Sequence, residues 1–174
     1  LGDIHLVRVF HMQIEYGEIN KGEIAPVPEG LDYDLWCGPA PMLPYRTASH
    51  WFVGLWDFYV GIIMADMIHQ VDLARCLIGK TYPDSVCHEG GVYYYNDDRE
   101  QPDTTFATLK FGDITMLLEG CLWAPYMHRI VLRENMNRYP DFPFCSTKVE
   151  VCGTEGFMYY GRHGGGWQAY KKKK

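Results

Sequence analysis

The 174-residue sequence has no run of about 18 apolar residues, the length that a membrane-spanning helix needs, so we expect no membrane segment. Its six cysteines include no C-x-x-C pair, which excludes the common zinc-ribbon and thioredoxin patterns. Basic residues are few: 16 Lys and Arg against 22 Asp and Glu give a formal net charge of −6. Nucleic-acid-binding proteins usually carry a basic stripe, so we expect no nucleic-acid partner.

The cysteines are widely spaced, which is more typical of reduced, buried thiols than of a disulfide framework. The one basic run, residues 171–174, ends the sequence, and we interpret it as disordered or as an artefact of the sequence end. The sequence opens at Leu1 on a strand pattern without an initiator methionine, so we expect the natural chain to begin further upstream. We expect a cytoplasmic protein, or an exported one whose signal lies upstream.

Glycine and proline divide the chain into a few regular segments. Residues 3–14 alternate in the manner of a strand, and residues 17–50 carry so many Gly and Pro residues that they predict a long loop, ordered through its aromatic side chains. Residues 57–79 predict one long helix, with Asp57 as its N-cap and Gly79 as its stop. Further strands are predicted over residues 85–95, 104–111, 114–123, 146–153 and 157–161.

The connections between the later strands are short, which implies antiparallel pairing. Residues 124–144, rich in Pro, Asn and Arg, predict a second excursion over the surface. We therefore predict one α+β domain over residues 1–170. Its open, mainly antiparallel sheet has one face covered by one long helix and by loop excursions.

Two aspartates and a histidine lie within the otherwise apolar helix stretch "MADMIHQVDLARCLIG", residues 64–79: Asp66, His69 and Asp72. At about 100° per residue, Asp66 and His69 share one helix face with Gln70. The stripe could face solvent, or it could serve proton transfer, with His69 as general acid/base and Asp66 beside it. A metal site is a third interpretation, but no second Glu-x-x-His or His-x-x-x-His pattern supports it, and we predict no metal.

Several stretches resemble one known family in the same order along the chain. They are "GDIHLVRV" (2–9), "PVPEGLDYDLWCGPAPMLPY" (26–45), "DMIHQVDLARCLIG" (66–79), "DTTFATLKFGDITMLLEG" (103–120) and "VEVCGTEGFMYY" (149–160). Together they resemble the C-terminal domain of the Gfo/Idh/MocA family, the glucose-fructose oxidoreductases, inositol dehydrogenases and their relatives, over residues 1–168.

The resemblance implies an oxidoreductase acting on a hydroxyl of a sugar or polyol such as a cyclitol. NAD or NADP would be held by an upstream Rossmann domain, with His69 as the acid/base and Asp66 orienting it. It also places Trp36 near the cofactor cleft and implies a homo-oligomer formed through the open sheet face. Aromatic rings suit the C–H surfaces of sugars as well as a core, so Trp56 and Tyr59 are candidate substrate contacts, with Asp72 as a third.

Three features depart from the family pattern. No G-x-G-x-x-G follows a strand and no Glu-Lys-Pro occurs, so we expect this chain alone to be inactive. The family places its aspartate four residues before the histidine, whereas that position is Ala65 here and Asp66 stands three before His69. The family's glycine run at the helix head is reduced to Gly61. The alternative is therefore a non-catalytic binding or oligomerisation module that retains the fold.

Overall fold

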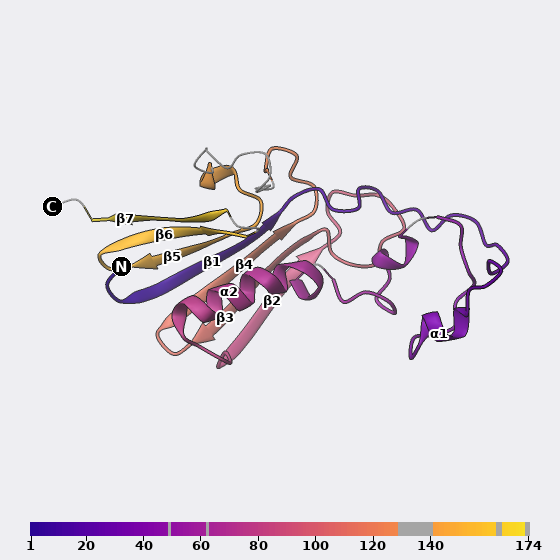
Figure 1. Ribbon diagram of the computed structural model, residues 1–174, viewed down its shortest axis with the longest axis horizontal. Coiled ribbons are helices and arrows are strands. Elements are labelled where there is room, and N and C mark those ends of the chain that lie inside the picture. Colours follow the sequence, from indigo (N-terminus) through magenta and orange to yellow (C-terminus); the bar gives the residue numbers. More distant parts are fainter. Residues whose placement is uncertain (49, 62, 129–140, 163–164, 173–174) are drawn as a thin grey trace.

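A computed structural model describes residues 1–48, 50–61, 63–128, 141–162 and 165–172 (Figure 1). One sheet holds seven strands: β1 (Ile4–Met12), β2 (Ser85–Gly91), β3 (Thr104–Phe111), β4 (Ile114–Cys121), β5 (Lys148–Gly153), β6 (Gly156–Gly161) and β7 (Gly166–Lys171). The helical segments are α1 (Tyr33–Cys37), α2 (Ile68–Ile78), a π-helical turn (Ile63–Met67) leading into α2, and two 3₁₀ turns (Trp51–Gly54 and Phe142–Phe144).

The strand order is β2-β3-β4-β1-β5-β6-β7, and the sheet is open. Strands β1 and β4 pair in parallel, and every other neighbouring pair is antiparallel. The predicted α+β class with a mainly antiparallel open sheet is therefore confirmed. The parallel pair arises because the first strand lies at the centre of the sheet, between two strands that come much later in the sequence.

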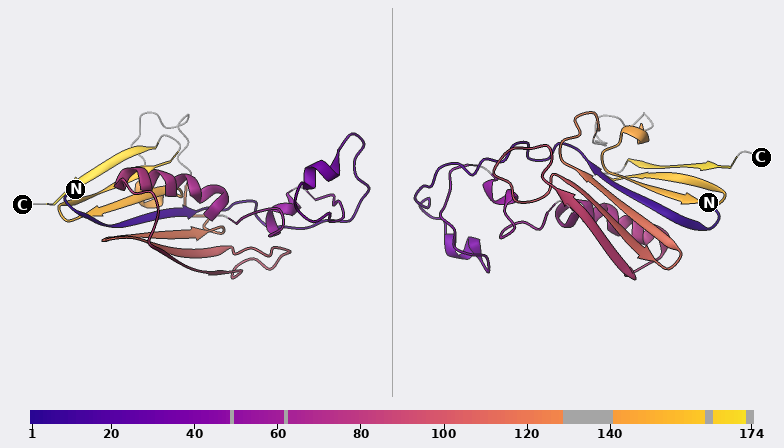
Figure 2. Two further views of the ribbon diagram at one scale, coloured as in Figure 1. Left: turned by 90° about the horizontal axis from the view of Figure 1, so that it is seen from below. Right: turned by 180° about the vertical axis from the view of Figure 1, so that it is seen from behind.

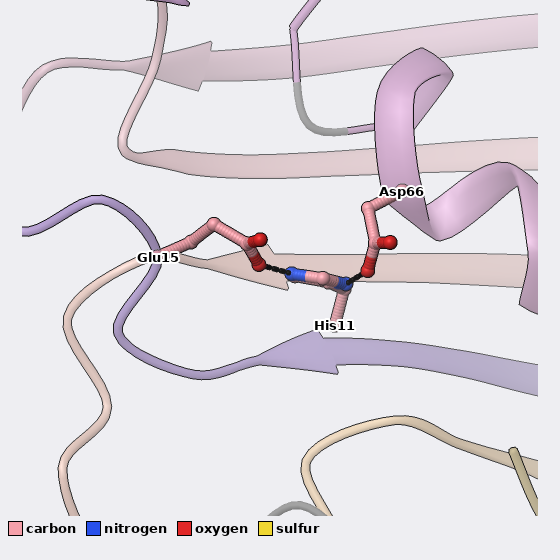
Figure 3. A group of neighbouring side chains, drawn as sticks. All are labelled: His11, Glu15 and Asp66. Atoms are coloured by element: carbon pink, nitrogen blue, oxygen red, sulfur yellow. Dashed lines mark hydrogen bonds and ion pairs between the residues drawn. The ribbon is translucent and has the colours of Figure 1, made fainter. Parts of the chain in front are cut away.

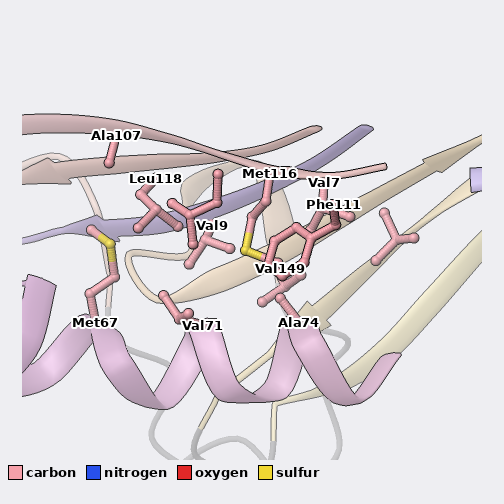
Figure 4. Packing of buried hydrophobic residues seen from close by; sticks show 12 residues of the cluster. Val7, Val9, Met67, Val71, Ala74, Ala107, Phe111, Met116, Leu118 and Val149 are labelled. Carbon is pink, nitrogen blue, oxygen red and sulfur yellow. The ribbon is translucent and has the colours of Figure 1, made fainter. Parts of the chain in front are cut away.

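Helix α2 lies across one face of the sheet, and the main hydrophobic core lies between the two (Figures 2 and 4). Met67, Val71 and Ala74 recur at helical spacing and are buried on the face of the helix that meets the sheet. Val7 and Val9 of β1 are fully buried beneath it. Because side chains alternate along a strand, His11 lies on this same face of β1, and its side chain is also fully buried.

The predicted helix start at Asp57 is wrong. The helical backbone begins at Ile63, because Gly61 has a φ of 79° and so breaks any helix running from residue 57. The predicted stop at Gly79 is confirmed: this glycine has a φ of 65°, and its N–H donates to the carbonyls of Arg75 and Cys76.

The C-terminal expectations also need correction. Strand β7, which the sequence analysis did not predict, begins at Gly166 and ends at Lys171. The Lys172 N–H donates to the Glu155 carbonyl, so the part of the lysine run that the structure describes is not disordered. Cys76 and Cys87 are exposed, against the expectation of buried thiols. Most of the predicted excursion over residues 124–144 lies outside the described residues.

Residues 13–61 form an extended arm that leaves β1, runs away from the sheet and returns to α2, with α1 near its far end (Figures 1 and 2). Aromatic rings pack within the arm: Trp36 stacks on Tyr33 at 5.4 Å and contacts Phe52 and Phe58 at 5.4 and 5.3 Å between ring centroids. The arm therefore has a small apolar cluster of its own. Among the described residues, no helix is long and apolar enough to cross a membrane.

Candidate functional site

A cluster of charged side chains lies where the end of β1 meets the start of the helix (Figure 3). His11 Nε2 lies 3.0 Å from Glu15 Oε2, and His11 Nδ1 lies 3.0 Å from Asp66 Oδ2. The second contact is an ion pair rather than an aligned hydrogen bond. Figure 3 shows the two carboxylates on opposite sides of the imidazole ring. The ring thus joins the strand end to the helix start.

The two carboxylates favour the protonated form of His11. Burial alone would lower its pKa, but Asp66 and Glu15 outweigh that effect and raise the pKa. Burial likewise acts to raise the pKa of Glu15, and the hydrogen bonds from His11 and Gln13 outweigh it, so this pKa is lowered. The cluster therefore contains a buried imidazole between two carboxylates that favour its protonated form.

Asp66 also meets a second cation, from the residue that follows β6. Arg162 Nη1 donates to Asp66 Oδ2 at 2.7 Å and lies 3.4 Å from Gln70 Oε1. Gln70 is fully buried one helical turn after Asp66 and donates to the Phe10 carbonyl. The contact with His11 lowers the pKa of Asp66 most, burial opposes it, and Arg162 lowers it further, so the pKa lies well below its usual range. The carboxylate is therefore fixed between two cations.

His11, Glu15 and Asp66 have ligand atoms within 4.8 Å of one another, a spacing compatible with a shared metal ion. A metal-bound imidazole must offer an unprotonated nitrogen, whereas both His11 nitrogens face carboxylates here. When His11 is protonated, it and Arg162 together balance the two carboxylate charges. The contacts in this structure therefore fit an ion-pair network better than a metal centre.

A pocket opens beside this cluster. It is lined by Glu15, Tyr16, Ile19, Val53, Gly54, Tyr59, Arg99, Gln101, Pro102 and Leu122. Burial raises the pKa of the Tyr59 phenol, and the neighbouring Tyr16 raises it further, so the phenol is neutral near pH 7. Glu15 belongs both to the cluster and to the pocket wall.

The structure does not bring Asp66 and His69 together. His69 is exposed on α2, and among the described residues no hydrogen bond or ion pair joins it to Asp66, whose partners are His11 and Arg162. Asp72 lies on the same exposed side of the helix as His69; its side chain is 68 % exposed and lies 3.5 Å from Arg75.

The three aromatic candidates also lie apart. Tyr59 lines the pocket, and Trp56 is 55 % exposed, with its backbone N–H bonded to Glu100. Trp36 belongs to α1 near the far end of the arm, away from α2 (Figure 1). Of the candidate site residues, the structure thus places Asp66 and Tyr59 at or beside the charged cluster.

Three cluster residues were missed by the sequence analysis: His11, Glu15 and Arg162. A signal for His11 was present, because it continues the Val7–Val9 face of the strand and is a histidine where a buried apolar residue is expected. Arg162 had no local signal, because it meets Asp66 only through the pairing of β5 with β6.

Comparisons with known proteins bear on what this site is. Residues 4–97 match the sequence model of the Gfo/Idh/MocA oxidoreductase family, C-terminal alpha/beta domain. No curated protein matches the chain. The matched segment contains β1, the arm, α2 and β2, and therefore His11, Glu15 and Asp66 of the cluster.

Solved structures share the fold at low identity. The WlbA dehydrogenase from Bordetella pertussis, solved with NADH and UDP-GlcNAcA, is 17 % identical with a TM-score of 0.51 over 99 % of this chain and 40 % of its own. A protein described as an oxidoreductase, from Thermotoga maritima, is 13 % identical with a TM-score of 0.56 over 99 % of this chain and 41 % of its own. The transcriptional regulator Gal80p from Kluyveromyces lactis is 12 % identical with a TM-score of 0.56 over 99 % of this chain and 37 % of its own.

This chain thus spans about 40 % of the length of these proteins. At such identities they establish the fold alone, whereas the sequence model covers more than half of the chain. The chain therefore belongs to the Gfo/Idh/MocA oxidoreductase family and carries its C-terminal domain.

Proposed function

We propose that this chain is the substrate-side half of an NAD- or NADP-dependent oxidoreductase that acts on a hydroxyl of a sugar or cyclitol. The observation that carries the proposal is the family match over residues 4–97, which contains His11, Glu15 and Asp66 of the charged cluster.

In this proposal His69 is the acid/base that takes or returns the hydroxyl proton. A catalytic base must reach its substrate, and His69 presents an exposed imidazole on α2. His11 is the less suitable histidine, because its side chain is fully buried and both ring nitrogens face carboxylates. Asp72, exposed one turn further along the helix, is the proposed contact to a neighbouring substrate hydroxyl.

Asp66 has a positioning role in this proposal. Its carboxylate joins the helix start to His11 of β1 and to Arg162, so it fixes the part of the chain that carries His69. Trp56 and Tyr59, which follow the 3₁₀ turn of the arm, are the proposed aromatic substrate contacts.

The dinucleotide would be held by another domain. The described residues contain no strand, glycine-rich turn and helix in succession, the unit that cradles a pyrophosphate, since β1 leads into the arm instead. The residues present therefore do not fit the cofactor on their own. We propose an upstream Rossmann domain as its holder, approached by Trp36 from the arm.

The test is His69→Ala in the full-length protein, with His5→Ala as the matched control, since His5 is also exposed. We expect the substitution at His69 to lower kcat by roughly 10²- to 10⁴-fold, the usual contribution of a general base, with little change in cofactor affinity. The His5 control keeps full turnover. If His69→Ala keeps turnover within a few-fold, His69 is not the base.

A specific observation favours the alternative, a non-catalytic binding or oligomerisation module. Asp66 pairs with His11 and Arg162, and among the described residues no hydrogen bond or ion pair joins it to His69. Fold alone does not decide between the two, since one fold hosts many functions. The alternative predicts that the full-length protein binds a ligand but turns over no sugar or cyclitol with NAD or NADP.

We also propose a homo-oligomer that forms through the sheet face opposite α2. Phe106 of β3 and Tyr170 of β7 are 50 % and 41 % exposed there, and Arg8 of β1 pairs across the face with Glu119 and Glu150. An open one-sided sheet leaves apolar area that a second copy can cover. Light scattering on the full-length protein tests this, and a monomer with this face intact would contradict it.

A further inference from the structure

We propose that Arg99 is a positioning residue that holds the arm in one orientation against the sheet and so sets where the aromatic side chains of the arm stand. Arg99 belongs to a short segment, residues 97–101, in the connection between β2 and β3, and we call this segment the clamp. The effect on the reaction rests on the proposed function, in which Trp56 and Tyr59 contact the substrate. The clamp itself follows from contacts between the described residues.

The clamp binds the first leg of the arm, residues 17–21, which leaves β1. The Ile19 N–H donates to Asp97 Oδ2 at 2.7 Å, and the Lys21 N–H donates to Asp98 Oδ2 at 3.0 Å. In return, the Asp98 N–H donates to the Ile19 carbonyl at 3.2 Å. Three hydrogen bonds to the backbone of the leg thus fix it to the clamp.

The clamp also binds the second leg, residues 54–59, which returns toward α2. The Glu100 carboxylate accepts from the Trp56 N–H at 3.2 Å. Gln101 is buried, and its side-chain amide donates to the Tyr59 carbonyl. Both residues of the second leg that are proposed to contact substrate are therefore bonded to the clamp through their own backbone.

The two legs and the clamp meet at one point, where Gly54 lies. A Cβ atom added to Gly54 would stand 3.0 Å from Ile19 Cγ2 and 3.3 Å from Arg99 Cα. These distances are shorter than ordinary van der Waals contacts, so the absence of a side chain lets the three segments approach. The arm is therefore packed closely between its two legs and the clamp.

Arg99 is the centre of the clamp. Its side chain is 1 % exposed and pairs at 2.7 Å with Asp97, which is 7 % exposed. Its Nη2 also donates to the Gly17 carbonyl at 2.7 Å, and its guanidinium carbon lies 3.8 Å from the centre of the Tyr95 ring. A buried cation is costly unless its partners are in place, so this arrangement tolerates little displacement of the first leg.

The ends of the arm carry backbone conformations at which the chain can turn. Tyr16 and Gly17 are both left-handed, with φ of 61° and 59°, and Gly61 at the other end has a φ of 79°. Hinges are a few loop residues that absorb changes of φ and ψ. The hydrogen bond from Arg99 to the Gly17 carbonyl holds the first of these two corners. The clamp, rather than the corners, therefore sets the orientation of the arm.

Amide hydrogen exchange on the full-length protein tests the clamp. Arg99→Met keeps a long side chain but removes its donors, so we expect exchange of residues 17–21 to rise about tenfold relative to that of β1. Arg99→Lys keeps the cation without the planar fork and should give a rise of about threefold, which carries the test if Arg99→Met does not fold. Arg8→Met is the matched control, because Arg8 also bridges two carboxylates but lies on the sheet. It should leave exchange of residues 17–21 within about twofold.

Two exchange results would overturn the proposal. One is exchange of residues 17–21 that stays within about twofold in both Arg99 variants. The other is a rise of the same size in β1, because uniform loss of protection reports global unfolding and would make Arg99 a contributor to overall stability only.

Steady-state kinetics of the full-length protein, with D-glucose or myo-inositol and NAD or NADP, tests the effect on the reaction. Arg99→Met should raise KM for the sugar or cyclitol about tenfold with kcat within about twofold, because displaced contacts weaken ground-state and transition-state binding alike. Arg99→Lys should restore part of the loss, and an unchanged KM in Arg99→Met would refute the positioning role. If the unsubstituted protein turns over neither probe while Arg99→Met loosens residues 17–21, the proposed function fails and the clamp stands.

Discussion

Replacing Asp66 by Asn should destabilise the fold through two partners at once. Asp66 Oδ2 lies 3.0 Å from His11 Nδ1 and 2.7 Å from Arg162 Nη1. The amide has nearly the same shape as the carboxylate, so packing changes little and the loss is mainly electrostatic. The substitution leaves the fully buried His11 with Glu15 as its remaining carboxylate.

The burial of the three side chains sets the magnitude of this loss of stability. Removing one member of a fully buried ion pair costs about 3–5 kcal/mol, and an exposed pair is worth only about 0.2–1 kcal/mol. The side chains of Asp66 and Arg162 are 22 % and 18 % exposed, while that of His11 is 0 % exposed. We therefore expect the free energy of unfolding to fall by about 2–3 kcal/mol, nearer the buried than the exposed case.

Urea unfolding near pH 6 measures this loss, and Asp72→Asn is the matched control. Asp72 lies on the same helix and also faces an arginine, but its side chain is 68 % exposed, so its substitution should cost less than about 0.5 kcal/mol. A loss of the same size for both variants would refute the argument that the buried network, rather than negative charge on the helix, stabilises the fold.

The same network fixes the sign of the pH dependence. The pKa of His11 is raised in the folded state, so its contribution is fully present below about pH 6.5, its unfolded pKa, and is lost as pH rises through the folded value. The pKa values of Asp66 and Glu15 are lowered, so their contributions are present above about pH 4 and are lost as pH falls. Stability from the network should therefore be greatest between about pH 4.5 and 6.5. Asp66→Asn should flatten the decline above pH 6.5, and an unchanged slope would contradict this assignment.

Two further substitutions test which backbone features stabilise the fold around the site. Gly79→Ala should lower the free energy of unfolding by about 1 kcal/mol, because the residue that ends α2 has a φ of 65°; the melting temperature checks this. Asp103→Asn should lower the free energy of unfolding by about 2–4 kcal/mol, because this fully buried carboxylate accepts hydrogen bonds from the backbone N–H groups of Tyr93, Tyr94 and Tyr95. Urea unfolding measures the change, and a loss below about 1 kcal/mol would show that the amide replaces those hydrogen bonds.

Local patterns in the sequence were enough to predict the strands that pair with the next strand along the chain. The hairpin of β3 and β4 follows from alternation on both sides of Gly112, and β3 has the predicted bounds of residues 104–111. The central place of β1 could not be predicted in this way, because β4 and β5 meet it only after more than a hundred intervening residues. Strand β7 was missed because its six residues, Gly166–Lys171, follow a glycine run and alternate weakly.

The candidate site was predictable in part, and for a related reason. Asp66 stood out as an acidic residue in an apolar helix, and the structure pairs it with the fully buried His11 and the partly exposed Arg162. Those partners come from the end of β1 and from the residue after β6, so no window of sequence contains all of them. Tyr59 was an aromatic candidate and lines the pocket, whereas nothing in the local sequence distinguishes Tyr16, which lines the same pocket.

The spacing of three residues between Asp66 and His69 accounts for the arrangement of the helix. Asp66 lies on the side of the helix that faces the sheet. Gln70, four positions later, is rotated by only about 40° from Asp66 around an α-helix and so lies on the same side. Gln70 accordingly shares Arg162 with Asp66 and is fully buried. His69 precedes Gln70 by about 100° and is turned out to solvent. In this chain Gln70 occupies the position four residues after the aspartate, where the family pattern has its histidine, and its side chain is buried in the core. The histidine stands three residues after the aspartate instead, and its side chain is exposed to solvent.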